Sequence, residues 1–276
     1  MLAPAAPPTP DASADFPVIR TRAAVLEELR RLLPRLENSR PAAALPFGLP
    51  AIDRHLPQGG LSCAAMHEIV PEESASAAAF GFVVALLSII LPRKAAGADE
   101  KTHPIFFVLP TYGLREHGRL YGHGLRAFGL DPAQVILVET THRKDTLWAM
   151  EEALRSGAPA AVAGMIEKLD LKTSQRLHLA ATDAGLPLFL LRPAQMLEAS
   201  AAATRWRVAP AVAARDRFGL IARARWHLLL ERCRNGRAGE WVVEYDHVAH
   251  RFSLGAALAD PALPRSASEK TFARSY

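Results

Sequence analysis

One stretch of the chain has the position, but not the residues, of a phosphate-binding loop. Residues 70–78 follow a strand-like run, 61–69, and open a long apolar helix. Loops in this position bind nucleotides through the pattern G-x-x-x-x-G-K-[ST], in which backbone N–H groups and the lysine contact phosphate and the hydroxyl holds Mg²⁺. Here Ala75 replaces the second glycine, Ser76 the lysine and Ala77 the hydroxyl residue.

The rest of the loop is equally unsuited to a triphosphate. No glycine occurs between Leu61 and Phe80, and Glu72 and Glu73 add two negative charges where a nucleotide needs positive ones. The sequence therefore predicts a strand, loop and helix that no longer bind a nucleotide cofactor. The degenerate loop comprises Pro71, Glu72, Glu73, Ser74, Ala75, Ser76 and Ala77.

A second group of residues suited to binding is a set of arginines in the last quarter of the chain. They come in pairs spaced two apart on strand-like runs, and residues i and i+2 of a strand share a face. Trp206 and Trp226 then point to the opposite face and anchor the strands on the core. The arginine rows suit nucleic-acid phosphates, an acidic protein surface or simply a solvated sheet face. The candidate partner-binding residues are Arg205, Arg207, Arg223, Arg225, Arg232 and Arg234.

Histidine and cysteine spacing gives no indication of a metal site. His117 and His123 are six residues apart, which does not align them on one helical face, and neither Cys-x-x-Cys nor His-x-x-x-His occurs. Cys63 and Cys233 lie far apart, each in a strand-like run, and are expected to be reduced core thiols of a cytoplasmic protein.

The composition is that of a globular protein with one basic end. Of 276 residues, 50% are hydrophobic and 22% are charged. The net charge of +5 resides in the last quarter, because residues 201–276 carry thirteen Lys and Arg against seven Asp and Glu. Such a distribution favours an acidic partner or nucleic acid.

Neither a secretory signal nor a membrane span is expected. The first fifteen residues are rich in Ala and Pro and lack a basic segment. The uncharged run 77–91 has fifteen residues, whereas a helix needs about 20 to cross a bilayer. A helix buried against a sheet explains the run better.

Beyond the loop, strand-like and helix-like segments alternate, which requires a mostly parallel sheet with helices on both faces. After residue 193 only strand-like segments follow, and Asn235-Gly236 marks a hairpin turn. We expect an antiparallel extension packed on the parallel sheet. The expected strands are 61–69, 105–109, 135–138, 160–166, 188–191, 206–208, 223–234, 241–245 and 252–254, and the expected helices are 114–128, 144–155 and 171–184.

The expected organisation has five parts. A disordered tail (1–15) precedes an amphipathic helix and linker (16–40), in which apolar residues recur at helical spacing over 19–37. The core with the degenerate loop follows (41–200), and then the Arg- and Trp-rich antiparallel extension (201–258) and a second disordered tail (259–276).

Several motifs in order resemble the RecA recombinase core. They are the segment 47–53, the Gly59-Gly60-Leu61 sequence, and the strand with its Pro-Glu-Ser loop at 68–74. The ImuA family, whose members are RecA-like with a ruined phosphate loop, is the closer match, because it also has a C-terminal block of Trp and Arg. Here that block is Arg225-Trp226-His227-Leu228 and 231–234.

This resemblance covers about residues 40–255 and implies a three-layer α/β RecA-like fold. It also implies an accessory factor of mutagenic translesion synthesis in the SOS response to DNA damage. The implied partners are the polymerase-like protein ImuB and, indirectly, an error-prone polymerase subunit and the sliding clamp. RecA, contacted through the N-terminal helix, and DNA at the nucleoid are further candidate partners.

The acids of an ATPase are also missing from their expected places. The strand 160–166 ends without Asp, and Pro110-Thr111-Tyr112-Gly113 follows the strand where the RecA pattern has a catalytic Glu. Glu116 comes too late, and Glu167 is expected to be a surface residue. We therefore expect a scaffold with no catalytic residues. The alternatives are a divergent nucleotide-binding ATPase and a cell-division inhibitor resembling SulA.

Overall fold

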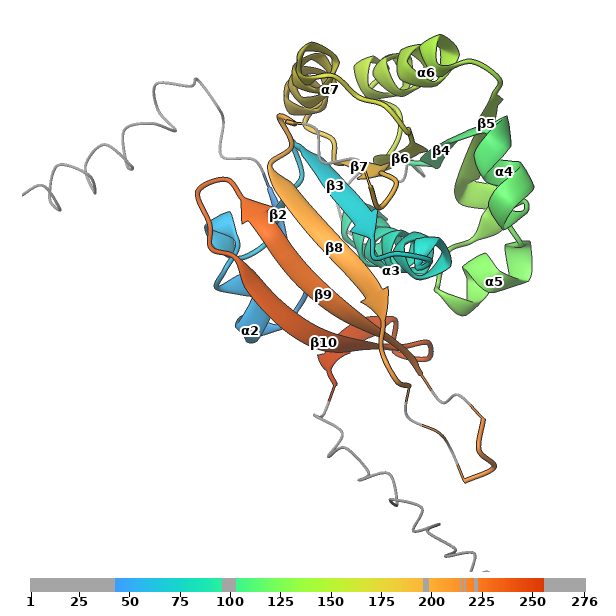
Figure 1. Ribbon diagram of the computed structural model, residues 1–276, viewed down its shortest axis with the longest axis vertical. Coiled ribbons are helices and arrows are strands. Elements are labelled where there is room, and N and C mark those ends of the chain that lie inside the picture. The colour runs from blue at the N-terminus through green and yellow to red at the C-terminus, as the bar shows by residue number, and fades with distance from the viewer. Residues whose placement is uncertain are drawn as a thin grey trace, which may run out of the picture. The chain divides into compact units, whose positions relative to one another are not determined.

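The computed structural model describes residues 43–95, 103–195, 199–213, 215, 217–220 and 223–255 (Figure 1). The tail expected over 1–15, the amphipathic helix within 16–40 and the tail expected over 259–276 lie outside the described residues.

The described residues form one nine-stranded sheet and a small two-stranded sheet. The large sheet has the order β11-β10-β9-β8-β3-β7-β6-β4-β5. The strands from β8 to β5 are parallel to one another, whereas the pairs β8–β9, β9–β10 and β10–β11 are antiparallel. Its strands are β3 (Met66–Pro71), β4 (Ile105–Pro110), β5 (Val135–Thr140), β6 (Ala161–Met165), β7 (Leu188–Leu191), β8 (Thr204–Pro210), β9 (Ala224–Cys233), β10 (Gly239–Asp246) and β11 (Arg251–Leu254); the small sheet pairs β1 (Ala44–Leu45) with β2 (Leu61–Ser62).

Helices cover both faces of the parallel strands, which gives three layers (Figure 1). The apolar helix α3 packs on one face, and α6 and α7 pack on the other. The three-layer RecA-like α/β fold predicted from the sequence is thereby confirmed. The helices are α2 (Pro50–Asp53), α3 (Ser76–Ala95), α4 (Thr111–His117), α5 (Gly122–Ala127), α6 (Arg143–Arg155) and α7 (Leu171–Ala184), with single 3₁₀ turns at Pro57–Gly59 and Pro132–Gln134.

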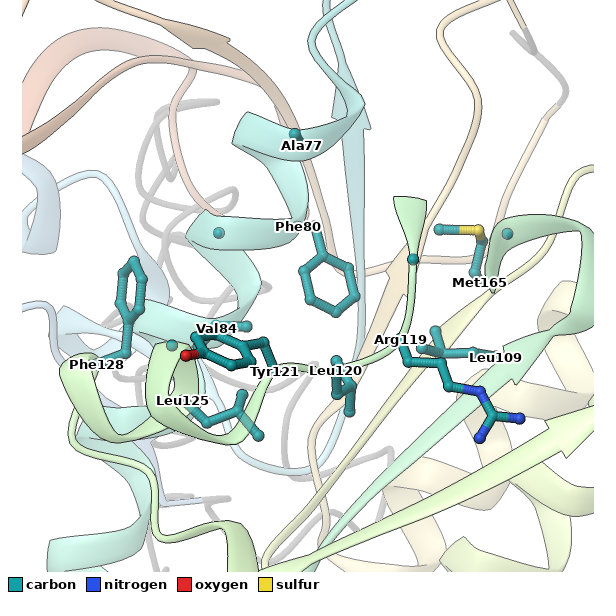
Figure 2. Close-up of a pocket in the computed structure, with 14 residues that line it drawn as sticks. Ala77, Phe80, Val84, Leu109, Arg119, Leu120, Tyr121, Leu125, Phe128 and Met165 are labelled. Atoms are coloured by element: carbon teal, nitrogen blue, oxygen red, sulfur yellow. The ribbon is translucent and has the colours of Figure 1, made fainter. Parts of the chain in front are cut away.

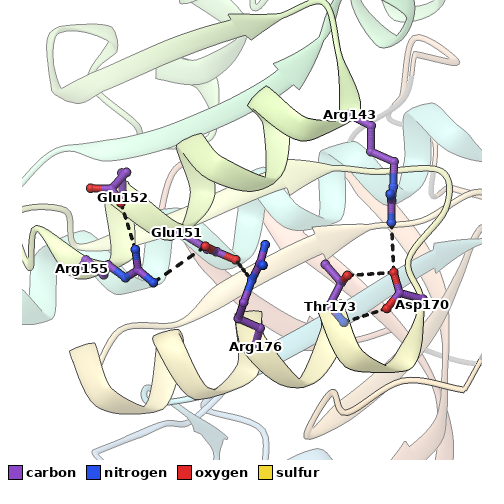
Figure 3. A network of polar contacts seen from close by, with 7 residues as sticks. All are labelled: Arg143, Glu151, Glu152, Arg155, Asp170, Thr173 and Arg176. Atoms are coloured by element: carbon purple, nitrogen blue, oxygen red, sulfur yellow. Dashed lines mark hydrogen bonds and ion pairs between the residues drawn. The ribbon is translucent and has the colours of Figure 1, made fainter.

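A polar network joins α6 to α7 on their outer side (Figure 3). Glu151 of α6, which is buried, is ion-paired with Arg176 of α7. At the other end, Arg143 pairs with Asp170 at 3.3 Å, and Asp170 caps α7 by accepting the Thr173 N–H at 2.9 Å. These bonds lower the pKa of Asp170 to about 2, so the cap is charged at neutral pH and suits the helix N-terminus.

An aromatic cluster fills the space between α3 and the C-terminal strands. Trp206 and Trp226 are 0% and 3% exposed. Phe82 of α3 lies with its ring centroid 6.4 Å from that of Trp206 and 6.0 Å from that of Trp226. Phe47 and Phe252 complete the cluster. The expectation that both tryptophans anchor their strands on the core is confirmed.

Three local expectations were wrong. The strand-like run 61–69 is divided into β2 and β3 by a bend that contains Cys63, so this cysteine is not in a strand. The helix expected over 114–128 is two helices, because Gly118 ends α4 with a φ of 78° that favours glycine. The C-terminal strands also do not pack on the sheet. β8 pairs parallel with β3, and β9 to β11 extend the same sheet at its edge.

The expected hairpin turn is confirmed. Asn235 adopts a φ of 60°, which asparagine tolerates better than most residues, and β9 and β10 pair antiparallel on either side of the turn. None of the helices in the described part of the chain combines the length and apolar character that a membrane crossing requires.

Candidate functional site

The degenerate loop joins β3 directly to α3. β3 ends at Pro71 and α3 begins at Ser76. Glu72, Glu73 and Ser74 between them are exposed, whereas Ala75 is 5% exposed and belongs to the core. The two carboxylates therefore lie in solvent at the carboxyl edge of the sheet, the edge at which α/β proteins bind their ligands.

The backbone of this loop already uses amide groups that a phosphate would need. The Glu72 N–H donates to the Val208 carbonyl at 2.9 Å, and the Ala75 N–H donates to the Glu72 carbonyl at 2.9 Å. A phosphate-binding loop instead points such N–H groups at the anion. The loop thus lacks the lysine, and two of its backbone N–H groups are already hydrogen-bonded within the protein.

The strand ends that would supply acids to an ATPase carry none. β4 ends at Pro110, and α4 begins at the next residue, Thr111, whose hydroxyl donates to the Thr140 carbonyl at 3.0 Å. β6 ends at Met165 and is followed by the buried Ile166. Glu167 is exposed, as predicted.

Metal ligands do not gather in the described part of the chain, where no group of three or more His, Cys, Asp or Glu residues could hold an ion. Cys63 and Cys233 are not joined in a disulfide, and both are partly buried. Burial raises the pKa of the Cys233 thiol to about 11, so this group is a neutral thiol at neutral pH and a poor nucleophile.

The predicted arginine rows lie on one face of the extended sheet, opposite the tryptophans. A β-bulge makes this possible on β9, where Trp206 is opposite Leu230 but Arg205 is opposite Arg232. The extra residue is Glu231. Without it, Arg232 would follow the alternation of Trp226 and Leu230 towards the core. Bulges commonly redirect side chains in this way.

Arg205 and Arg232 meet a buried acid that sequence reasoning missed. Glu68 of β3 is 1% exposed and lies 2.8 Å from both Nε and Nη2 of Arg205. The Arg192 Nε lies 4.0 Å from the same carboxylate, and the Arg192 side chain is 3% exposed. Glu68 also acts electrostatically on Arg232. A carboxylate inside an apolar strand was the one available sequence signal, since buried acids need partners.

Three more of the predicted arginines are neutralised by neighbouring acids. Arg207 pairs with Glu231 at 2.5 Å, and the buried Arg225 pairs with Glu244. Arg223 lies 3.1 Å from Asp246. Positive and negative charges therefore alternate across these strands, and opposite charges on neighbouring strands stabilise a sheet.

Arg232 and Arg234 differ from the other four. Arg232 donates to the carbonyls of Ser200 and Ala202, both at 2.6 Å. Arg234 donates to the Ala201 carbonyl at 3.3 Å. Within the described residues, neither guanidinium has a carboxylate at ion-pair distance. Both are exposed, so the pair forms a net positive spot at the end of β9.

The positive spot also affects a neighbouring histidine. Burial and the charges of Arg234 and Arg232 lower the pKa of His178 to about 4. The neutral His178 accepts the Met66 N–H through Nδ1 at 3.3 Å. At neutral pH this ring therefore adds no charge of its own to the spot.

Comparison with known proteins identifies the relatives of this chain. No protein-family model matches it. Protein ImuA from two strains of Caulobacter vibrioides is 32% identical over 238 residues, which cover 80% of this chain and 92% of the relative. The chain belongs to the ImuA family. The resemblance inferred from the sequence is confirmed, and a match over 80% of this ImuA-family chain is too long to be confined to the core at 41–200.

Proposed function

We propose that this ImuA-family protein is a non-catalytic RecA-like scaffold or regulator of error-prone translesion synthesis in the DNA-damage response. Membership of the ImuA family is the observation that carries the proposal. The partner would be an ImuB-type polymerase-like protein, which in turn links the scaffold to an error-prone polymerase subunit and the sliding clamp. RecA and DNA are secondary candidates, and the setting would be the cytoplasm at the nucleoid.

The geometry of the degenerate loop supports a role without ATP hydrolysis. Ser76 stands where the lysine would contact phosphate, and the Ala75 N–H is bonded to the Glu72 carbonyl. The ends of β4 and β6 offer Pro110 and Met165 in place of acids. The loss of the cation and of both acids removes three of the groups on which phosphoryl transfer depends.

The positive spot formed by Arg232 and Arg234 supports a contact with an acidic partner surface. Arginine is enriched in interface hot spots, because its planar guanidinium binds carboxylates with two parallel hydrogen bonds. The other four candidate arginines already have acidic neighbours within the chain, so we assign them a structural role and the spot the binding role.

A co-purification experiment with the ImuB-type protein of the same organism tests this assignment. We expect Arg232→Glu with Arg234→Glu to abolish co-purification. Arg54→Glu with Lys144→Glu is the matched control, because it changes the charge equally at two exposed residues, one directly after α2 and one on α6. Arg234→Glu alone is a milder second variant that leaves the Arg232 bonds to Ser200 and Ala202 in place.

Two results would count against the proposal. Undiminished co-purification of folded Arg232→Glu with Arg234→Glu would remove the assignment of the spot. Calorimetric titration of the wild-type chain with ATP and Mg²⁺ should give no heat of binding, and a saturable heat would favour the divergent ATPase instead. Binding to single-stranded DNA that weakens steeply with salt would add DNA to the partners.

A further inference from the structure

The strand β5 is an outer edge of the nine-stranded sheet (Figure 1). It pairs in parallel with β4 over all six of its residues, from Ile105 opposite Val135 to Pro110 opposite Thr140. Within the described residues, no strand lies on its other side. Along that side, alternate residues of an edge strand present backbone N–H and C=O groups that have no partner strand. The chemistry of the occupant is therefore defined, because only another extended backbone can pair with such a row.

β5 lacks the features that usually protect an edge strand. Edges are commonly blunted by short length, by Lys or Pro, or by a β-bulge. The opposite edge, β11, has four residues and begins with the exposed Arg251. β5 has six residues, contains neither Lys, Arg nor Pro, and pairs with β4 without a bulge. This edge is therefore open to pairing with another strand.

The side chains of β5 are apolar on both faces of the sheet. Val135 and Leu137 pack against the core cluster on the α3 side, and Val138 packs against the cluster on the side of α6 and α7. Ile136 shares the face of Val138, because residues two apart in a strand point the same way. The Ile136 residue is 42% exposed. An added strand would remove this aliphatic side chain from water as well as pair the backbone.

The charges at this edge are few. Asp131 and Glu139 are the charged residues within 131–140. The Glu139 carboxylate is paired with Arg119 at 3.2 Å. Asp131 precedes the strand and accepts the Ala133 N–H at 3.1 Å. A strand added here meets no row of like charges, so the edge favours neither a strongly acidic nor a strongly basic occupant.

The edge is complementary to a second copy of itself. A two-fold axis perpendicular to the sheet places two β5 strands side by side and antiparallel, and keeps each face of the sheet on its own side. With the axis at Leu137, Ile136 of one copy lies opposite Val138 of the other. These two aliphatic side chains share one face, so they form a cross-strand pair. Glu139 lies opposite Val135 and not opposite another acid.

We propose that two copies of this chain join edge to edge through β5 into a two-fold symmetric dimer. Such an isologous contact closes after two subunits, whereas a contact between β5 of one copy and β11 of the next would build an open filament. Pairing of one short strand buries less area than a standard protein interface of about 1,600 Å², so we expect a dissociation constant on the order of micromolar.

The dimer makes the proposed scaffold bivalent. The positive spot of Arg232 and Arg234 lies at the end of β9, which is separated from β5 by the strands β8, β3, β7, β6 and β4. These six spacings amount to about 29 Å at about 4.8 Å each. Pairing through β5 therefore leaves both spots uncovered, and one dimer holds two acidic partner surfaces at once. This consequence, but not the dimer itself, rests on the proposed function.

Sedimentation equilibrium of the full chain tests the dimer. The measured mass of the wild type should rise from that of one chain, 29.9 kDa, towards twice this value as the concentration increases. Ile136→Asp buries a charge in the paired edge and should weaken dimerisation at least about tenfold. Leu179→Asp is the matched control and should dimerise as the wild type does, because Leu179 of α7 is also an exposed aliphatic residue, at 59%.

Cysteine cross-linking tests the register. Leu137→Cys stands on the proposed axis, where directly opposite Cβ atoms lie about 4.5–5.5 Å apart, so mild oxidation should give covalent dimers. Glu139→Cys, at an exposed position of the same strand, is displaced from its counterpart in the other copy by about 14 Å along the strand and should not cross-link. The wild type, which has Cys63 and Cys233, gives the background.

Four outcomes would overturn the proposal. They are a wild-type chain that stays monomeric at hundreds of micromolar, assembly that continues beyond the dimer, a folded Ile136→Asp variant that dimerises as tightly as the wild type, and equal cross-linking of Glu139→Cys and Leu137→Cys. Monomeric Ile136→Asp should still co-purify with the ImuB-type protein, because it leaves Arg232 and Arg234 in place. Failure of the dimer is thereby distinguishable from failure of the proposed partner contact.

Discussion

Arg205 binds Glu68 across two neighbouring parallel strands, and this ion pair joins the C-terminal strands to the first strand of the core. The two residues are paired in register. Both the Nε and the Nη2 of Arg205 lie 2.8 Å from the same carboxylate oxygen. The side chains are 14% and 1% exposed, so the carboxylate depends on the arginine for its stability in the core.

Removing the acid of this pair should strongly destabilise the protein. Glu68→Gln removes the carboxylate that lies against the Arg205 guanidinium in a largely buried site, and breaking a buried ion pair costs about 3–5 kcal/mol. Urea unfolding should show this loss. Glu68→Met with Arg205→Met removes both charges and should be more stable than Glu68→Gln. A loss of less than about 1 kcal/mol in the free energy of unfolding of Glu68→Gln would mean that the ion pair does not stabilise the fold.

The tryptophan on β9 should be sensitive to a change that keeps its aromatic ring. The Trp226 Nε1–H donates to the Ala78 carbonyl of α3 at 2.9 Å. Trp226→Phe removes this bond and some packing, so we expect a loss of about 1–2 kcal/mol in the free energy of unfolding. Trp226→Ala should cost about 3–5 kcal/mol. Trp148→Phe, at a tryptophan that is 65% exposed, is the control and should be neutral.

Sequence patterns predicted the features that depend on local alternation. The β–α alternation gave the parallel sheet, and the period of two placed Trp206 and Trp226 in the core. The helix expected over 171–184 was also correct, and Gly185 directly after it adopts a left-handed φ of 65°. These features are determined by residues close together in the chain, so they can be derived from the sequence.

Features that depend on contacts between distant segments could not be derived. The bulge at Glu231 decides which face Arg232 joins, yet it arises only from the register with β8. The acids that neutralise Arg225 and Arg205 come from β10 and β3. The apolar pocket that residues of α3, β4 and α5 line (Figure 2) exists because α4 ends at Gly118 and because α3 lies opposite α5. No pattern among residues that are close in the sequence predicts these contacts.

Restoring the phosphate-loop residues should not restore ATP hydrolysis. Ala75→Gly with Ser76→Lys and Ala77→Ser recreates the end of the pattern, but Pro110 and Met165 still stand at the strand ends. Without an acid to hold Mg²⁺ or orient water, phosphoryl transfer has no catalyst. Phosphate release from ATP should equal the wild-type background. Release of phosphate above this background would show that the changes in the loop alone account for the absence of ATP hydrolysis.

Acidification below neutral pH should destabilise the fold through His67. Burial lowers the pKa of this ring to about 4 from 6.5. Its Nδ1 accepts from the Thr204 hydroxyl at 2.8 Å, and its Nε2 donates to the Ser62 carbonyl at 2.9 Å. The folded protein therefore holds the neutral ring. Between pH 6.5 and pH 4 the unfolded chain binds a proton at this ring that the folded chain does not, so His67 alone lowers stability by about 3 kcal/mol as the pH falls. His178, whose pKa is also lowered to about 4, adds to the fall in the same pH range.

The pH dependence can be assigned to His67 by a matched pair of variants. His67→Gln keeps a donor and an acceptor but cannot titrate, so its free energy of unfolding should fall less steeply than that of the wild type between pH 6.5 and pH 4. His142→Gln, at an exposed position, should follow the wild-type curve. Parallel curves for wild type and His67→Gln would mean that the buried ring is already protonated in the folded state, and that its bond to Thr204 runs in the opposite sense.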